Sequence, residues 1–134
     1  MPLIDTSIHG AIHELRLARP PVNALNPELC EALAQALDDA VAAGAQGIVL
    51  AGGPKVFSAG LDVPYLLSLG DDQDALLAAW TVFFKAARTL LACPVPVVAA
   101  LAGHSPAGGC VLALCCDYRT MAEGPYRIGL NDTQ

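Results

Sequence analysis

Aromatic residues and positive charge are both scarce in this chain of 134 residues. Phe, Trp and Tyr make up 5% of it, and seven Lys and Arg stand against 13 Asp and Glu. Nucleic-acid binding needs a clustered basic face, so we expect no nucleic-acid partner. With so few aromatics, the 54% hydrophobic content comes from Ala, Leu and Val, which is typical of helices covering a tightly packed sheet. The composition therefore predicts an α/β fold.

Long apolar runs and targeting signals are missing as well. No apolar run approaches the roughly 18 residues that a membrane-spanning helix needs, so no membrane partner is expected. The first residues show neither a secretory nor a transit signal, which predicts a cytoplasmic protein. No linker or low-complexity stretch is visible, so residues 1–134 are interpreted as a single domain.

The cysteines lack the pattern of a metal site. Their number is odd and most of them lie in apolar segments, where a small buried thiol is the usual role. They are Cys30, Cys93, Cys110, Cys115 and Cys116. The last three lack CxxC spacing and no nearby histidine completes a site, so no metal is predicted.

The apolar pattern predicts two successive β-α-β steps. A β-hairpin at 3–17 is followed by an extended loop at 19–25 and by a helix from Pro27 to about Ala43, capped by Asn26. The elements expected after it are a strand at 47–51, a helix ending at Leu91, a strand at 96–101, a turn at 103–108, a helix at 109–115 and a strand at 117–121. The second helix should bury an apolar stripe of Leu76, Leu77, Trp80, Phe83, Phe84, Ala87, Leu90 and Leu91.

The segment from Gly103 to Cys110 excludes two familiar kinds of site. A serine nucleophile elbow needs a backbone N–H directly after the serine, and the residue after Ser105 is Pro106, which has none. A phosphate loop needs lysine and a hydroxyl after its last glycine, and Gly109 and Cys110 stand there. Ser105 is therefore interpreted as a turn residue and His104 as a solvated loop residue.

Two glycine-bearing turns carry the functional prediction. They are Ser58-Ala59-Gly60-Leu61-Asp62 and Pro106-Ala107-Gly108-Gly109-Cys110. Glycine lets backbone approach a ligand closely, and a helix N-terminus directs free N–H groups at negative charge. Together the two turns predict an anion hole.

At these motifs the sequence resembles the crotonase (enoyl-CoA hydratase/isomerase) superfamily. The matching runs are 21–25, 56–62 and 106–110, and with 116–119 and 128–134 they look most like the mitochondrial-type Δ3,Δ2-enoyl-CoA isomerases. The resemblance implies a crotonase-like ββα spiral core, apparently truncated, with the N-terminal part present and the C-terminal part absent. It also implies a homo-oligomer, either a trimer or a dimer of trimers.

The resemblance also implies roles for individual residues. The backbone N–H groups of Leu61 and Gly108 would form an oxyanion hole, and Asp132 would be the base, where the isomerases have glutamate. Coenzyme A would enter as part of the substrate and not as a separate cofactor. Its contacts would come from Val22, Ala59, Gly60, Leu61, Asp62, Val63, Gly108 and Asn131. Arg19 and Lys55 are weaker candidates for its phosphates, and Asp62 is also a candidate helix cap.

Val111 favours a double-bond shift over water addition. The hydratases that the chain resembles have one glutamate directly after the Gly-Gly-Cys turn and another further on, and Val111 takes the first position. Shifting a double bond from C3 to C2 of an enoyl-CoA, as in fatty-acid β-oxidation, needs one acid–base group and a stabilised dienolate. Asp132 is one methylene shorter than glutamate, which predicts slower proton transfer. A hydratase-type lyase and a CoA-binding or assembly module without chemistry are the alternatives.

Overall fold

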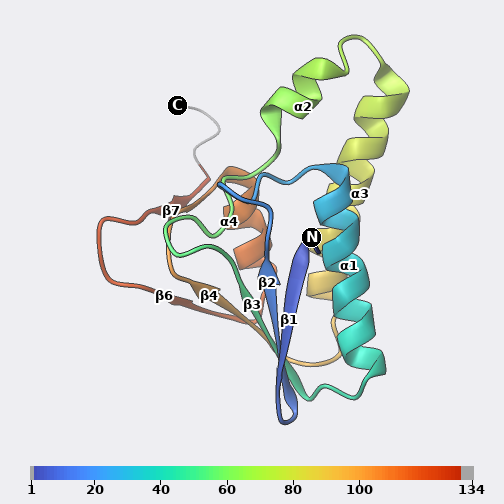
Figure 1. The fold of residues 1–134 in the computed structure, drawn as a ribbon. Coiled ribbons are helices and arrows are strands. Elements are labelled where there is room, and N and C mark those ends of the chain that lie inside the picture. The colour runs from blue at the N-terminus through green and yellow to red at the C-terminus, as the bar shows by residue number, and fades with distance from the viewer. Residues whose placement is uncertain (1, 131–134) are drawn as a thin grey trace.

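The computed structural model describes residues 2–130, in which helices pack on a five-stranded sheet (Figure 1). In the order β1-β2-β3-β4-β6 the strands are β1 (Ile4–His9), β2 (Ile12–Leu17), β3 (Gly47–Ala51), β4 (Val97–Leu101) and β6 (Tyr118–Met121). β1 and β2 form the predicted antiparallel hairpin, and every later strand joins in parallel. The α/β prediction is confirmed.

Helix α1 (Pro27–Ala42) forms the crossover that makes β2 and β3 parallel. The Asn26 side chain accepts a hydrogen bond from the Leu29 N–H at 2.9 Å, and Pro27 occupies the first helical turn. Leu29, Leu33 and Leu37 are fully buried in the hydrophobic core. The helix and its cap are where the sequence predicts them.

Two aspartates begin the next two helices. The Asp62 side chain accepts a hydrogen bond from the Tyr65 N–H at 3.0 Å at the start of α2 (Val63–Ser68). In the same way, the Asp72 side chain accepts from the Ala75 N–H at 3.0 Å at the start of α3 (Gln73–Leu91). The predicted capping role of Asp62 is confirmed, and the stretch expected to carry one helix carries two.

The exposed side of α3 corrects the predicted core stripe. Leu77, Trp80, Phe84 and Leu91 are between 41% and 68% exposed. The buried positions of α3 are Ala79, Phe83, Ala86, Ala87 and Leu90. They follow helical spacing, but the stripe is narrower than predicted, and three of its five residues are alanines. α3 packs along α1. The predicted centre of the buried stripe is wrong because the prediction favoured Leu and Trp, which are more hydrophobic than Ala.

The segment predicted as a turn at 103–108 contains a short strand. β5 (Ser105–Pro106) pairs in parallel with β7 (Ile128–Gly129), and the Ser105 N–H donates to the Arg127 carbonyl at 2.9 Å. α4 (Ala107–Leu114) then begins two residues before the predicted Gly109. The interpretation of Ser105 as a turn residue is therefore wrong, because its pairing partner lies too far along the chain to leave a local signal.

Buried thiols contribute to the core, as predicted. Cys30, Cys110 and Cys116 are buried, whereas Cys93 and Cys115 are half-buried. Burial is the main cause that raises the pKa of Cys30 and of Cys116 to about 12. A thiol with so high a pKa carries almost no thiolate at neutral pH, so these two side chains act as small apolar groups.

Gly109 is the position where an added methyl group should harm the fold most directly. A Cβ there would stand 2.2 Å from the Ser58 carbonyl oxygen, so the backbone of one turn would have to move. We expect Gly109→Ala to lower the free energy of unfolding by about 1 to 3 kcal/mol in denaturant titration. Gly129→Ala is the control, since its methyl would meet nothing within 4 Å. Equal stability of the two variants would contradict the close approach of the turns.

Candidate active site

The first glycine turn leaves one backbone donor unused. Along 59–62, the Ala59 N–H donates to the Val22 carbonyl at 2.9 Å, the Gly60 N–H to the Ser58 hydroxyl at 3.2 Å and the Asp62 N–H to the Leu25 carbonyl at 3.2 Å. The Leu61 N–H donates to no acceptor within residues 2–130. Leu61 therefore presents the free donor within a run whose other N–H groups are all bonded.

The direction of that donor is set by the peptide that contains it. The Gly60 carbonyl accepts a hydrogen bond from the Leu25 N–H at 2.8 Å, within an isolated parallel bridge between Leu25 and Leu61. In a planar trans peptide the N–H points opposite to the carbonyl. The Leu61 N–H must therefore point away from Leu25. Gly60 has a φ of +97°, a conformation that a side chain would strain.

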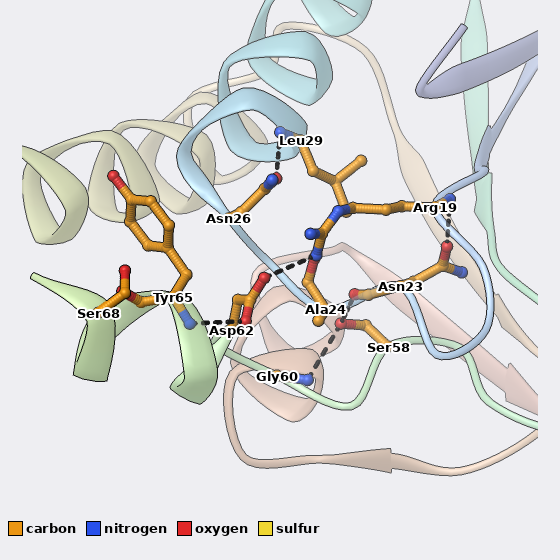
Figure 2. Close-up of polar contacts among 10 residues, drawn as sticks. All are labelled: Arg19, Asn23, Ala24, Asn26, Leu29, Ser58, Gly60, Asp62, Tyr65 and Ser68. Atoms are coloured by element: carbon orange, nitrogen blue, oxygen red, sulfur yellow. Dashed lines mark hydrogen bonds and ion pairs between the residues drawn. The ribbon is translucent and has the colours of Figure 1, made fainter. Parts of the chain in front are cut away.

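A buried polar network holds this turn against the loop at 19–25 (Figure 2). The Asn23 side chain donates to the Phe57 carbonyl at 2.9 Å and accepts from the Arg19 N–H at 2.7 Å. The Ser58 hydroxyl donates to the Asn23 carbonyl at 2.8 Å and is fully buried. Asn23 itself has a φ of +52°, which asparagine tolerates better than most residues. The network fixes the backbone that precedes Leu61.

The second turn supplies its donor from the start of α4. Because α4 begins at Ala107, the Gly108 N–H lies in the first helical turn, where no backbone acceptor of the same helix can reach it. It donates to no acceptor in the described part of the chain. Ala107 has a φ of +48°, a strained conformation for a residue with a side chain. Strain of this kind is typical of functional backbone.

The two turns are in direct contact where these donors lie. A Cβ built on Gly60 would stand 3.0 Å from the Gly108 nitrogen. A Cβ built on Gly108 would stand 3.3 Å from the Leu61 nitrogen and 3.3 Å from Gly60 Cα. Two unpaired N–H groups at a helix N-terminus can bind an anion or a polarised carbonyl oxygen. The structure thus brings together Gly60, Leu61 and Gly108, as the sequence predicts.

The remaining predicted contact residues lie around this point. Val22 is joined to Ala59 through the backbone, and Val63 is exposed at the start of α2. Both carboxylate oxygens of Asp62 are engaged, one by the Tyr65 N–H and the other by Arg19. The predicted base Asp132 and the predicted contact Asn131 lie outside the described residues.

A small apolar pocket adjoins Leu61 between α2 and α3. Its lining includes Leu25, Leu61, Tyr65, Leu66 and Trp80, and its volume is about 10 Å³. That is room for about one water molecule at most. α2 has no buried residue, so a small displacement of this helix would widen the pocket at little cost.

His104 and Arg19 have structural partners that the sequence did not reveal. His104 is half-buried, and its Nδ1 accepts a hydrogen bond from the Arg127 N–H at 3.1 Å, so its interpretation as a solvated loop residue is wrong. Arg19 pairs with Asp62 at 2.9 Å, whereas Lys55 is exposed. The roles of Asn23, Ser58 and Arg19 in shaping the turn were missed because their partners lie up to 43 residues away in the sequence.

Residues 2–130 contain neither a metal-binding cluster nor a membrane-spanning helix. No group of three His, Cys, Asp or Glu side chains there could hold a metal ion. None of the helices in this range is both long and apolar enough to cross a bilayer.

Comparison with known proteins places the two turns in a family. The sequence pattern of the enoyl-CoA hydratase/isomerase family matches residues 7–134. The chain belongs to this family. Its fold is accordingly the crotonase fold, and the resemblance inferred from the turn motifs is confirmed.

Individual members of the family include isomerases and hydratases. Mitochondrial enoyl-CoA delta isomerase 1 of Mus musculus is 36% identical, with 98% of this chain and 46% of the mouse protein covered. The crystal structure of human mitochondrial delta3-delta2-enoyl-CoA isomerase matches with a TM-score of 0.92 at 33% identity, covering 98% of this chain and 52% of that one. A probable enoyl-CoA hydratase of Bacillus subtilis is 31% identical, with 92% and 48% covered. The chain thus spans about half the length of these relatives.

Ser58 is expected to stabilise the first turn through both of its hydrogen bonds. Ser58→Ala leaves the Asn23 carbonyl and the Gly60 N–H without this partner in a site closed to water, so we expect a loss of about 1 to 3 kcal/mol in the free energy of unfolding. Ser68→Ala is the matched control, because among the described residues that exposed hydroxyl bonds only to Tyr65, in its own helix. Denaturant titration should leave the control within about 0.5 kcal/mol of the unaltered protein. A Ser58 variant as stable as the control would contradict the role of the network.

Proposed function

We propose that the protein is a Δ3,Δ2-enoyl-CoA isomerase of fatty-acid β-oxidation. The observation that carries the proposal is the meeting of two unpaired backbone donors, Leu61 N–H and Gly108 N–H, in a family that processes CoA thioesters. In this proposal both N–H groups donate to the thioester carbonyl oxygen. The predicted contacts of Val22, Ala59 and Asn131 with CoA belong to the same proposal.

The proposed reaction moves one proton and one double bond. A base removes a proton from C2 of a 3-enoyl-CoA, and the resulting negative charge spreads as a dienolate onto the thioester oxygen. The protonated base then returns the proton to C4, which leaves the double bond between C2 and C3. Because the charge on oxygen develops only as the proton leaves, donors at that oxygen accelerate the step. Each such donor contributes on the order of 10²- to 10³-fold in rate.

The apolar start of α4 supports isomerisation over hydration. Residues 107–114 include no carboxylate, and Val111 packs half-buried against the core at the position where the hydratases have a glutamate. Water addition would lack that acid–base group. Asp132 remains the proposed base for the proton transfer. The similarity to both isomerases and a probable hydratase supports the shared thioester chemistry.

Assembly and location remain predictions. A trimer or dimer of trimers is what the family resemblance implies. The name of the mouse relative places that protein in mitochondria. The acyl chain is proposed to enter the apolar pocket beside Leu61, with α2 moving outward.

Turnover of a 3-enoyl-CoA tests the proposed reaction. The purified protein should form the conjugated 2-enoyl-CoA, followed by the ultraviolet absorbance of the conjugated thioester. Asp132→Ala should lower kcat by about 10²- to 10⁴-fold, because it removes the only proposed acid–base group. Asp132→Glu, which restores the methylene, should raise kcat, by as much as about 10²-fold if the reach of the carboxylate limits the rate.

Two controls separate this reaction from its alternatives. Asp71→Asn removes an exposed carboxylate between α2 and α3 and should leave kcat unchanged. Gly108→Ala should lower kcat while leaving Asp132 intact, since its methyl would crowd the Leu61 nitrogen. Equal turnover by the unaltered protein and by Asp132→Ala would contradict the proposed isomerase activity with Asp132 as its base. Water addition to a 2-enoyl-CoA would favour the hydratase, and binding of acyl-CoA without turnover would favour a binding module.

A further inference from the structure

Arg19 and Asp62 form the most buried ion pair among residues 2–130. Their side chains are 32% and 11% exposed, and Arg19 Nη1 lies 2.9 Å from Asp62 Oδ2. The same nitrogen donates to the Ala24 carbonyl at 2.8 Å (Figure 2). The pairs Arg16–Glu14 and Lys85–Glu31 are more exposed. Because solvent screens it least, the Arg19–Asp62 pair should hold its geometry most firmly.

The two acceptors of Arg19 flank the backbone bridge that orients the Leu61 N–H. Ala24 directly precedes Leu25, and Asp62 directly follows Leu61, while Leu25 and Leu61 are the bridged residues. One guanidinium nitrogen therefore holds the two bridged segments side by side. The bridge has only two backbone hydrogen bonds, and the one from the Asp62 N–H to the Leu25 carbonyl is long at 3.2 Å.

We infer that Arg19 and Asp62 are positioning residues, which set the place of the Leu61 N–H at the substrate oxygen. This inference rests on the proposed function, since it assigns a purpose to that donor. The bridge is isolated and follows a glycine, so the backbone alone constrains Leu61 weakly. A misplacement of about 1 Å at a catalytic group can cost about 10²-fold in rate. The Arg19–Asp62 ion pair restricts the position of the Leu61 backbone.

The bonding of the pair indicates that it acts through Leu61 and not by direct contact with substrate. Asp62 uses one carboxylate oxygen for the Tyr65 N–H and the other for Arg19. Arg19 Nη1 is shared between Asp62 and Ala24. The carboxylate thus links the start of α2, the Leu61 backbone and the loop at 19–25. Arg19 is interpreted here as a positioning group, in place of the weaker prediction of a phosphate contact.

The ratio of the affinity for a thioester to the affinity for a thioether measures how well the Leu61 and Gly108 N–H groups bind the carbonyl oxygen. This measurement requires no turnover. A saturated acyl-CoA and the S-alkyl-CoA of equal length differ in the carbonyl oxygen that Leu61 and Gly108 would contact. The unaltered protein should bind the thioester about tenfold more tightly, as expected for the net contribution of two backbone hydrogen bonds to that oxygen. Asp62→Asn and Arg19→Gln should each reduce that ratio to about twofold or less, and the double variant should reduce it no further. Arg19→Lys retains a cation near the Ala24 carbonyl oxygen and the Asp62 carboxylate, so it should keep most of the affinity ratio.

Asp72→Asn is the matched control for Asp62→Asn. Asp72 caps α3 with the same 3.0 Å hydrogen bond but has no ion pair within residues 2–130, so its variant should keep the full ratio. Variants at 19 and 62 that lose stability yet keep the ratio would overturn the inference and leave the proposed function intact. An unaltered protein with no preference for the thioester would instead contradict the proposed function, and the inference with it. If Asp62→Asn does not fold, Arg19→Gln and Arg19→Lys carry the comparison.

Discussion

The hydrogen bond from the Leu25 N–H to the Gly60 carbonyl determines what the first turn can do. It fixes one side of a rigid peptide, and the N–H of Leu61 on the other side must then point away from Leu25. Every neighbouring N–H of the turn already has a partner. This backbone hydrogen bond thus leaves the Leu61 N–H available to a ligand, while the other N–H groups of the turn stabilise the fold.

The surrounding structure supports this peptide from two directions. Asn23 and Ser58 fix the backbone that leads into the turn, through hydrogen bonds closed to water. Gly60 and Gly108 keep the second turn close enough for its own free N–H to lie beside Leu61. None of these groups has to change its charge for a carbonyl oxygen to be polarised. Binding therefore depends on backbone shape, while proton transfer depends on a separate carboxylate, proposed as Asp132.

Much of the fold follows from local signals in the sequence. Asn26 and Pro27 mark the start of α1, Asp62 marks that of α2, and the apolar run at 47–51 predicts a buried strand. These features act over a few residues, so a single sequence reveals them. The two glycine turns can also be predicted from the sequence, because each motif spans only a few adjacent residues. Their contact could be expected only through the resemblance to a family.

The features that were missed depend on partners distant in the sequence. Ser105 forms a strand only because Ile128 lies beside it, and His104 is held by Arg127. Trp80 and Phe84 are apolar yet exposed, whereas three alanines of α3 lie on its buried face. The pairing of Arg19 with Asp62 spans 43 positions and leaves no periodic pattern. Spatial proximity, and not residue type, decides each of these cases.

The amide resonances of Leu61 and Gly108 test most directly whether the two turns bind a thioester oxygen. In an ¹⁵N–¹H titration of the protein with a saturated acyl-CoA, both amide protons should move downfield with one shared dissociation constant. The amides of Ala59, Gly60 and Asp62, which already donate hydrogen bonds, should move much less. An acyl-CoA that binds while the Leu61 and Gly108 amides stay in place would contradict the anion hole.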